Sequence, residues 1–303
     1  MNDSLTASSR RFAALALVVN AFVWGVSWWP FRELQSHGLH PLWATAGVYA
    51  VSILVLLAFR PRALQGLGSH PQLFVLMAAA GMTNVGFNWA VTEGDVVRVV
   101  LLFYLMPAWS TLLAWPLLGE RPTASALLRL AVALGGVFVI LKTVDTAWPV
   151  PQSLPDWLAL AGGFSFAVTN IMLRRLHAAP AVTRVGVMFA GGAIAATGTA
   201  LFAGVGAPVL LPPQAWGIAI ALSLGFLAAN AALQYGASRL PAQTTSLVML
   251  SEVVFASVSS VVLGASVLTA NIWAGGAMVL SAAAWAALAV PAKAAGTGAQ
   301  SSA

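Results

Sequence analysis

Residues 102–120 read Leu-Phe-Tyr-Leu-Met-Pro-Ala-Trp-Ser-Thr-Leu-Leu-Ala-Trp-Pro-Leu-Leu-Gly-Glu, and a faint copy of this apolar segment occurs later in the chain. In each copy a short break that contains glycine leads into another apolar segment, 127–141 in the first and 272–290 in the second. Two weakly similar apolar halves are typical of membrane transporters. The four positions that recur 145 residues apart are Leu102, Leu105, Leu118 and Gly119, which return as Leu247, Leu250, Leu263 and Gly264.

The composition places the chain in a lipid bilayer. Of its 303 residues, 60% are hydrophobic and 7% are charged, whereas soluble domains carry roughly 25% charged residues. A membrane-spanning helix needs about 20 mainly apolar residues. The sequence therefore predicts an all-α polytopic membrane protein with ten transmembrane helices, at residues 12–34, 41–59, 72–92, 96–118, 123–143, 155–177, 183–204, 214–237, 241–263 and 269–290.

Several classes of chemistry find no support in the sequence. The chain has no cysteine, which excludes disulfides, thiolate metal ligands and cysteine nucleophiles. Its four histidines (His37, His40, His70 and His177) fall in or beside predicted loops, with no carboxylate cluster next to them. We therefore expect no metal site, no cofactor and no enzymatic activity. The net charge of +6 would suit a nucleic acid, but the basic residues follow a membrane pattern instead.

The basic residues predict the orientation in the membrane. With ten spans both termini lie on one side, and a cytoplasmic start places eleven basic residues inside and three outside. This asymmetry follows the positive-inside rule, so we expect a bacterial inner-membrane protein with both termini in the cytoplasm and no nucleic-acid partner. The inside residues are Arg10, Arg11, Arg60, Arg62, Arg121, Arg129, Arg174, Arg175, Arg184, Arg239 and Lys293, and the outside ones are Arg32, Arg98 and Lys142.

The segments divide into two halves. We expect a cytoplasmic tail (1–11), a first five-helix repeat (12–143), a periplasmic linker (144–154), a second five-helix repeat (155–290) and a disordered cytoplasmic tail (291–303). Because each half has five spans, the second half inserts upside down relative to the first. Polar residues recur in register between the halves: Asn84, Asn88 and Trp89 correspond to Asn230, Gln234 and Tyr235 at a shift of 146, while Trp24 and Ser27 correspond to Phe166 and Thr169 at a shift of 142.

Polar and aromatic stripes mark the faces that we expect to turn toward a cavity. In the segment 12–34, Asn20, Trp24, Ser27 and Phe31 share one helical face. Tryptophans near the segment ends are interpreted as interface anchors, whereas Trp24 lies near the middle of its segment. Either cavity lining or packing explains Trp24. The tryptophans interpreted as anchors are Trp29, Trp43, Trp148, Trp157, Trp216 and Trp273.

The segment 72–92 carries two asparagines one turn apart, Asn84 and Asn88, together with Phe87 and Trp89. An amide in hydrocarbon is costly without a partner, so both asparagines should face inward. Hydrogen bonding between helices and contact with a substrate explain this pattern equally well.

The segment 96–118 contains Tyr104, Pro107, Trp109 and Pro116. Proline removes a backbone donor and leaves a carbonyl without its usual partner. Two prolines in one membrane helix therefore predict a bend at Pro107 and Pro116, which would act either as a hinge or as a fixed kink.

The segment 241–263 holds Glu252, the one ionisable residue that we place deep in the membrane. An acidic residue at mid-helix costs about 2.5–3.5 kcal/mol even on lenient insertion scales, so it must be paired, hydrated or protonated. It would serve as a coupling residue or as the partner of a substrate ammonium group. The alternative is a neutral or hydrogen-bonded glutamate that only fixes the packing.

In three sequence features the chain resembles the EamA-type families of the drug/metabolite transporter superfamily. These features are Trp24-Gly25-Val26-Ser27, the run from Pro107 to Gly119-Glu120, and Glu252 in the second half. Within that superfamily the chain is most similar to the bacterial aromatic amino-acid exporters of the YddG type. The resemblance covers nearly the whole length. It implies two inverted five-helix repeats around a central cavity and export of phenylalanine, tyrosine, tryptophan and related compounds.

The second half departs from the family pattern at two positions. Glu252 is followed by Val253 where the family usually has proline, and Gly264 by Ala265 where it usually has glutamate. The missing proline argues against a symmetric hinge in the segment 241–263. The missing glutamate suggests that the two halves do not gate alike.

We therefore predict a monomeric secondary transporter that works by alternating access and exports aromatic amino acids. Aromatic side chains would form the walls for a planar ring, and amides and a hydroxyl would bind the amino and carboxyl groups. Rivals are the same carrier with another amino acid, a nucleoside or an organic cation as cargo, and an intramembrane enzyme. The expected substrate-binding residues are Trp24, Ser27, Asn84, Phe87, Asn88, Trp89, Tyr104, Phe166, Asn170, Asn230 and Gln234.

Overall fold

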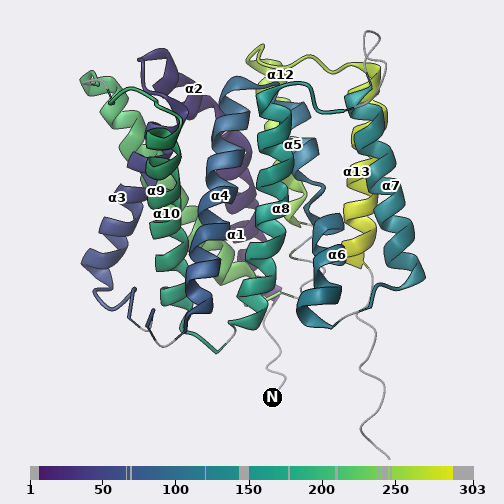
Figure 1. Cartoon of the computed structure of the whole chain (residues 1–303), viewed down its shortest axis with the longest axis horizontal. Helices are drawn as coiled ribbons and strands as arrows, with labels where there is room; N and C mark the ends of the chain where they lie inside the picture. Colours follow the sequence, from purple (N-terminus) through teal and green to yellow (C-terminus); the bar gives the residue numbers. More distant parts are fainter. Residues whose placement is uncertain are drawn as a thin grey trace, which may run out of the picture.

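The computed structural model of the chain is a bundle of helices that run up and down between two ends (Figure 1). It describes residues 7–65, 67–68, 70–119, 121–142, 150–176, 178–208, 211–237, 239–240, 245 and 248–288. In these residues all regular secondary structure is helical. We call the end at which the first helix begins the lower end and the opposite end the upper end, as they lie in Figure 1.

The helices of the first half follow the predicted segments closely. Asp95 and Thr123 each accept a backbone N–H at the start of the helix that follows them, as expected for N-cap residues. The elements are α1 (Ala7–Val26), α2 (Trp28–Ser36), α3 (Pro41–Phe59), α4 (Gln72–Glu93), α5 (Val96–Phe103), α6 (Met106–Leu118) and α7 (Ala124–Leu141).

The second half also follows the prediction, although part of its fourth segment lies outside the described residues. Ser153 caps the first helix of this half by accepting the N–H of Asp156. Residues 241–244, 246 and 247 of the predicted segment 241–263 are among those not described. The elements are α8 (Leu154–Arg175), α9 (Ala181–Phe202), α10 (Pro213–Ala237), α12 (Ser251–Val262) and α13 (Ala270–Leu288).

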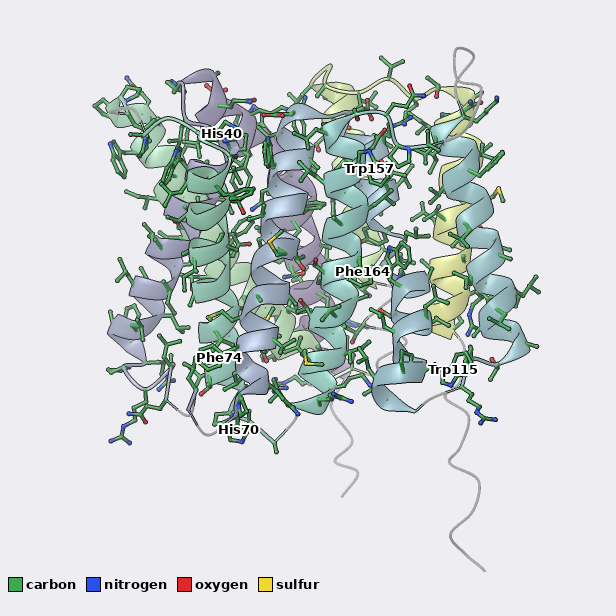
Figure 2. All side chains as sticks on the ribbon, in the orientation of Figure 1. His40, His70, Phe74, Trp115, Trp157 and Phe164 are labelled. Carbon is green, nitrogen blue, oxygen red and sulfur yellow. The ribbon has the colours of Figure 1, made fainter. Side chains whose placement is uncertain are left out.

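Eight helical stretches of the described residues are long and apolar enough to cross a membrane. Two of them, Arg11–Ser36 and Val96–Leu118, each comprise two helices in sequence. Many large apolar side chains on the outside of the bundle are exposed, among them Phe74, Trp115 and Trp157 (Figure 2). Such a surface suits a bilayer, where hydrocarbon covers it. A polytopic membrane protein is thus confirmed.

Three helices are interrupted near the middle of the bundle. The first two breaks fall at Ser27, between α1 and α2, and at Tyr104–Leu105, between α5 and α6. The third precedes α12, whose first residue follows Leu250. The expected bend near Pro107 thus occurs one turn earlier, and Pro107 lies in the first turn of α6. Pro116 lies inside α6 without ending it.

Two glycines 145 residues apart adopt the same backbone conformation. Gly119 follows α6 with φ of 73°, and Gly264 follows α12 with φ of 68°. Glycine reaches this left-handed region without the steric cost that a Cβ adds, and it ends helices in this way. The sequence echo between Leu118-Gly119 and Leu263-Gly264 is therefore matched by local structure.

Close helix contacts depend on glycines in α9 and α13. Gly191 lies directly against the Met77 backbone, which joins α9 to α4, and Gly275 lies against Gly136, which joins α13 to α7. Small residues let helix backbones approach in this way. These contacts make α4–α9 and α7–α13 tightly packed pairs.

Gly191→Ala should destabilise the protein, because the added Cβ would collide with the Met77 carbonyl. Overpacking of this kind costs about 1–3 kcal/mol. Gly198→Ala in the same helix is the matched control, since no atom lies within 4 Å of its added Cβ. Thermal unfolding of both variants in the same detergent checks this, and an equal melting temperature for the two would contradict the contact.

Candidate functional site

A chain of aromatic rings lies at the middle of the bundle. The Trp24 ring stacks on Phe226 with centroids 4.4 Å apart, and its other neighbour is Phe87 at 6.3 Å. Phe87 meets Phe103 at 4.8 Å, and Phe103 meets Phe166 at 5.7 Å. The structure therefore brings together the predicted wall residues Trp24, Phe87 and Phe166. Phe103 and Phe226 complete the cluster.

A tyrosine and a glutamate connect the two interrupted helices of the fourth and ninth segments. Tyr104 lies at the break between α5 and α6. Its hydroxyl oxygen is 3.1 Å from Glu252 Oε2 and 3.2 Å from the Met249 carbonyl oxygen. Tyr104 is buried, and Glu252 is half-buried. Within the part of the chain that the structure describes, no cation pairs with Glu252. Its carboxylate can therefore take a proton or a cationic ligand.

The two asparagines of α4 bind the neighbouring helix α3. The Tyr49 hydroxyl donates to Asn84 Oδ1 at 2.6 Å, and Asn84 Nδ2 donates to the Ala80 carbonyl. Asn88 Nδ2 donates to Thr45 Oγ1 at 3.3 Å, while Asn88 Oδ1 is buried and has no hydrogen-bond partner. In this state Asn84 thus serves helix packing, and Asn88 keeps one acceptor unused.

The other predicted polar residues are not gathered in one place. The Ser27 hydroxyl donates to the Trp24 carbonyl of its own turn. Asn170 and Asn230 are half-buried and form no hydrogen bond with another described residue, and Gln234 is exposed near the lower end. Trp89 packs near the upper end, with its ring 5.3 Å from that of His40.

A small cavity continues from Tyr104 toward the lower end. It lies among α6, α7 and α13, and its volume of about 20 Å³ leaves room for roughly one water molecule. Arg129 is the only charged residue that lines it. The lining consists of Tyr104, Pro107, Ala108, Thr111, Arg129, Leu130, Ala133, Val279, Ala282 and Ala283.

The two halves of the fourth span differ sharply in packing. Every residue of α5, in the upper half, is buried except Arg98, which is half-buried. In α6, in the lower half, Ala108 alone is buried. The bundle is therefore closed around the upper half of this span and loosely packed around the lower half.

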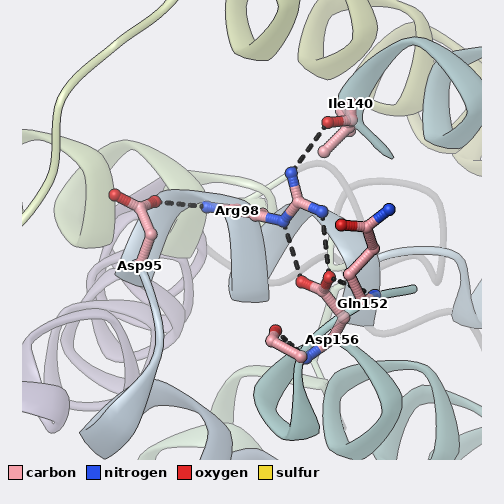
Figure 3. Close-up of polar contacts among 6 residues, drawn as sticks. Asp95, Arg98, Ile140, Gln152 and Asp156 are labelled. Carbon is pink, nitrogen blue, oxygen red and sulfur yellow. Dashed lines mark hydrogen bonds and ion pairs between the residues drawn. The ribbon is translucent and has the colours of Figure 1, made fainter. Parts of the chain in front are cut away.

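An ion pair holds the upper end together (Figure 3). Arg98 of α5 donates from Nε and Nη2 to the two carboxylate oxygens of Asp156 in α8, at 2.8 and 2.9 Å. Its Nη1 donates to the Ile140 carbonyl of α7 at 2.9 Å, and the Gln152 N–H donates to Asp156. Two parallel hydrogen bonds to one carboxylate are the strongest form of this contact.

Two further contacts join the halves at the upper end. Trp28 Nε1 of α2 donates to the Ser259 hydroxyl of α12 at 2.9 Å. The backbone N–H groups of Val96 and Val97, at the start of α5, point at the Ser266 hydroxyl. Ser259 and Ser266 of the second half thus accept hydrogen bonds from donors of the first half.

Sequence reasoning missed Arg98 and Asp156 as a functional pair. Arg98 counted only as one of three basic residues outside, and Asp156 lay just beyond the expected linker. The available signal is the rarity of charged residues, since only eight of 303 residues are acidic. An acidic residue at the start of a membrane helix is therefore a candidate partner for an arginine that has no other explanation.

Comparison with known proteins agrees with this architecture. Residues 11–142 match the EamA-like transporter family. A protein of Pseudomonas aeruginosa named only as an uncharacterized transporter is 28% identical over 177 residues, which are 56% of each chain. The match thus spans little more than half the length of that relative. The first half of the chain is thus similar to the EamA-like transporter family.

The fold is also shared with a crystal structure of another protein. That structure aligns over 91% of this chain and 97% of its own, with a TM-score of 0.59 and 20% identity. At this identity the likeness shows the fold alone. It extends beyond the residues of the EamA-like match into the second half of the chain.

Tyr104→Phe should destabilise the protein, because Glu252 and the Met249 carbonyl would both lose the hydroxyl donor. A buried acceptor left without its partner costs about 1–3 kcal/mol. The wild type, which keeps both contacts, is the reference. Unfolding by denaturant in mixed micelles measures the difference. Equal stability of Tyr104→Phe and the wild type would show that the Tyr104 contacts contribute nothing.

Proposed function

We propose that the chain is a secondary transporter of the EamA type that exports aromatic amino acids and similar small metabolites by alternating access. The observation that carries this proposal is the position of the aromatic cluster beside the Tyr104–Glu252 contact, where two interrupted helices meet. Transporters place their sites at such interruptions near mid-membrane, because freed backbone groups and polar side chains there can bind cargo.

The arrangement of helix contacts supports two inverted five-helix halves at 12–143 and 155–290. The main contacts between spans of different halves have counterparts when the halves are exchanged: α4 with α8 and α10 with α1, α4 with α9 and α10 with α3, α6 with α8 and α12 with α1. In the pairs α3–α9, α5–α12 and α7–α13, each helix contacts its own counterpart in the other half. Such pairing is expected of a pseudo-two-fold axis between the halves.

The proposed orientation follows from the positive-inside rule. The distribution of basic residues places the lower end and both termini in the cytoplasm of a bacterium, and the upper end outside. Cargo would then load from the lower end and leave at the upper end. We propose that the protein acts as a monomer, because each half supplies residues to the site.

The cargo chemistry follows from the side chains at the centre. Trp24, Phe87 and Phe166 offer faces and edges to a planar ring. Glu252 would receive the ammonium group or a coupling proton. The amides of Asn170 and Asn230, which bind no other described residue, are free to bind the cargo carboxylate. Neutral amides bind it weakly, which suits a carrier that must release its cargo.

One observation also favours an organic cation as cargo. The site combines an aromatic cluster with a carboxylate that has no cationic partner among the described residues. Rings and a carboxylate together attract cations without needing a cargo carboxylate. Flux measurements decide between the two cargo classes.

Purified protein in lipid vesicles should move radiolabelled tryptophan and phenylalanine faster than protein-free vesicles. Unlabelled phenylalanine should compete with tryptophan for the same site, whereas tetraethylammonium should not. Movement of organic cations without any amino-acid flux would overturn the aromatic amino-acid assignment and leave a cation carrier.

Glu252→Gln should remove the dependence of tryptophan flux on pH while tryptophan binding persists, if Glu252 carries the coupling proton. Glutamine keeps the size and an acceptor for the Tyr104 hydroxyl but cannot be protonated. Glu93→Gln, at the exposed last residue of α4 at the upper end, is the control and should behave as the wild type. An unaltered pH profile in Glu252→Gln would exclude the coupling role. A rise in KM without a change in pH profile would assign Glu252 to the cargo ammonium.

A further inference from the structure

We propose that the Arg98–Asp156 ion pair is a one-sided lock, which holds the upper end closed and biases the carrier toward a state that is open at the lower end. This inference rests on the alternating access of the proposed function. It assigns to two residues the control of which end opens.

The ion pair is built to resist separation. Asp156 is 2% exposed, and its two carboxylate oxygens are both engaged by Arg98. The guanidinium also reaches the end of α7 at Ile140, so one side chain holds α5, α7 and α8 in register. Opening the upper end between α5 and α8 would expose and separate both charges. A buried charge left without its partner is strongly unfavourable.

The counterpart positions at the lower end carry no charge. In an inverted duplication the contact between the fourth and sixth spans at one end corresponds to a contact between the ninth and first spans at the other. The shift of 145 relates Arg98 to Gln243, and the shift of 142 relates Asp156 to Ala14. Glutamine and alanine cannot form an ion pair. The side-chain chemistry therefore closes one end more firmly than the other.

A second contact shows the same asymmetry. The hydrogen bond from Trp28 to Ser259 ties the first span to the ninth at the upper end. The corresponding positions at the lower end are Asn170 and Ala114. Alanine offers no acceptor, and Asn170 forms no hydrogen bond with another described residue. Two contacts that close the upper end thus have no equivalent at their counterpart positions.

The packing of the fourth span agrees with this bias. In its upper half, α5, every residue except Arg98 is buried, whereas α6 has Ala108 as its one buried residue. The cavity below Tyr104 lies among α6, α7 and α13. The passage to the proposed site is therefore tight on the locked side and loose on the other.

The natural absence of cysteine permits a direct test by single-cysteine labelling. Val100→Cys reports on the upper half, because Val100 is 2% exposed and lies one turn above Tyr104 in α5. Thr111→Cys reports on the lower half, since Thr111 lines the cavity. Both variants are placed in lipid nanodiscs, where a charged maleimide reaches both ends, and the labelling rates are compared with Arg98 intact and with Arg98→Gln or Asp156→Asn.

With the pair intact, Thr111→Cys should react faster than Val100→Cys. Breaking the pair should raise the rate at Val100→Cys about tenfold or more, because one buried charge loses its partner, and should lower the rate at Thr111→Cys. An unchanged rate at Val100→Cys would overturn the lock. A rise at both reporters would also overturn it, because that result means local unfolding and not an exchange between two states.

Arg32→Gln is the matched control. Arg32 is also an arginine at the upper end, but it donates to the Val91 and Gly94 carbonyls within the first half. It should leave both labelling rates unchanged, and an equal rise at Val100→Cys would overturn the special role of Arg98. No cargo is present in these measurements. A reciprocal change of the two rates therefore supports the lock even if aromatic amino acids prove not to be the cargo.

Discussion

The contact of the Tyr104 hydroxyl with Glu252 and with the Met249 carbonyl lies where two long helices lose their regular hydrogen bonds. Hydrocarbon tolerates irregular backbone only where protein or trapped water satisfies the freed groups. Here one hydroxyl of the first half faces both a carbonyl and a carboxylate of the second half. The two breaks are therefore interdependent, and a shift of one helix changes the environment of Glu252, the only acid at this depth among the described residues.

Tight and loose packing are separated in the bundle. Glycines bring α4 against α9 and α7 against α13 at backbone distance, and such pairs resist relative motion because any shift creates a clash or a void. The interrupted helices carry the aromatic cluster and the polar contact instead. Under the proposed alternating access, motion is expected in the spans that line the site, while the glycine-packed pairs keep their form.

The sequence predicted the helices well because their signal is local: long apolar runs ended by proline, glycine and capping residues. The segment 41–59 matches α3 at both ends. The site was harder to predict, since contacts across the bundle leave no local mark. Phe226 and Tyr49 were missed because isolated aromatic residues in apolar helices look like packing. Asn84 was identified, but the sequence could not show that its amide is occupied by Tyr49, which depends on how α3 lies against α4.

Duplication gives the two ends of a carrier the same backbone possibilities, so any preference for one closed end must come from side chains that the halves do not share. The equilibrium between two such states moves only by the difference in free energy between their contacts. Arg98 and Asp156 have counterparts without charge, and Trp28 and Ser259 have a counterpart pair without an acceptor. If the protein exports its cargo, as proposed, this arrangement lets the site load from the lower end before the upper end opens.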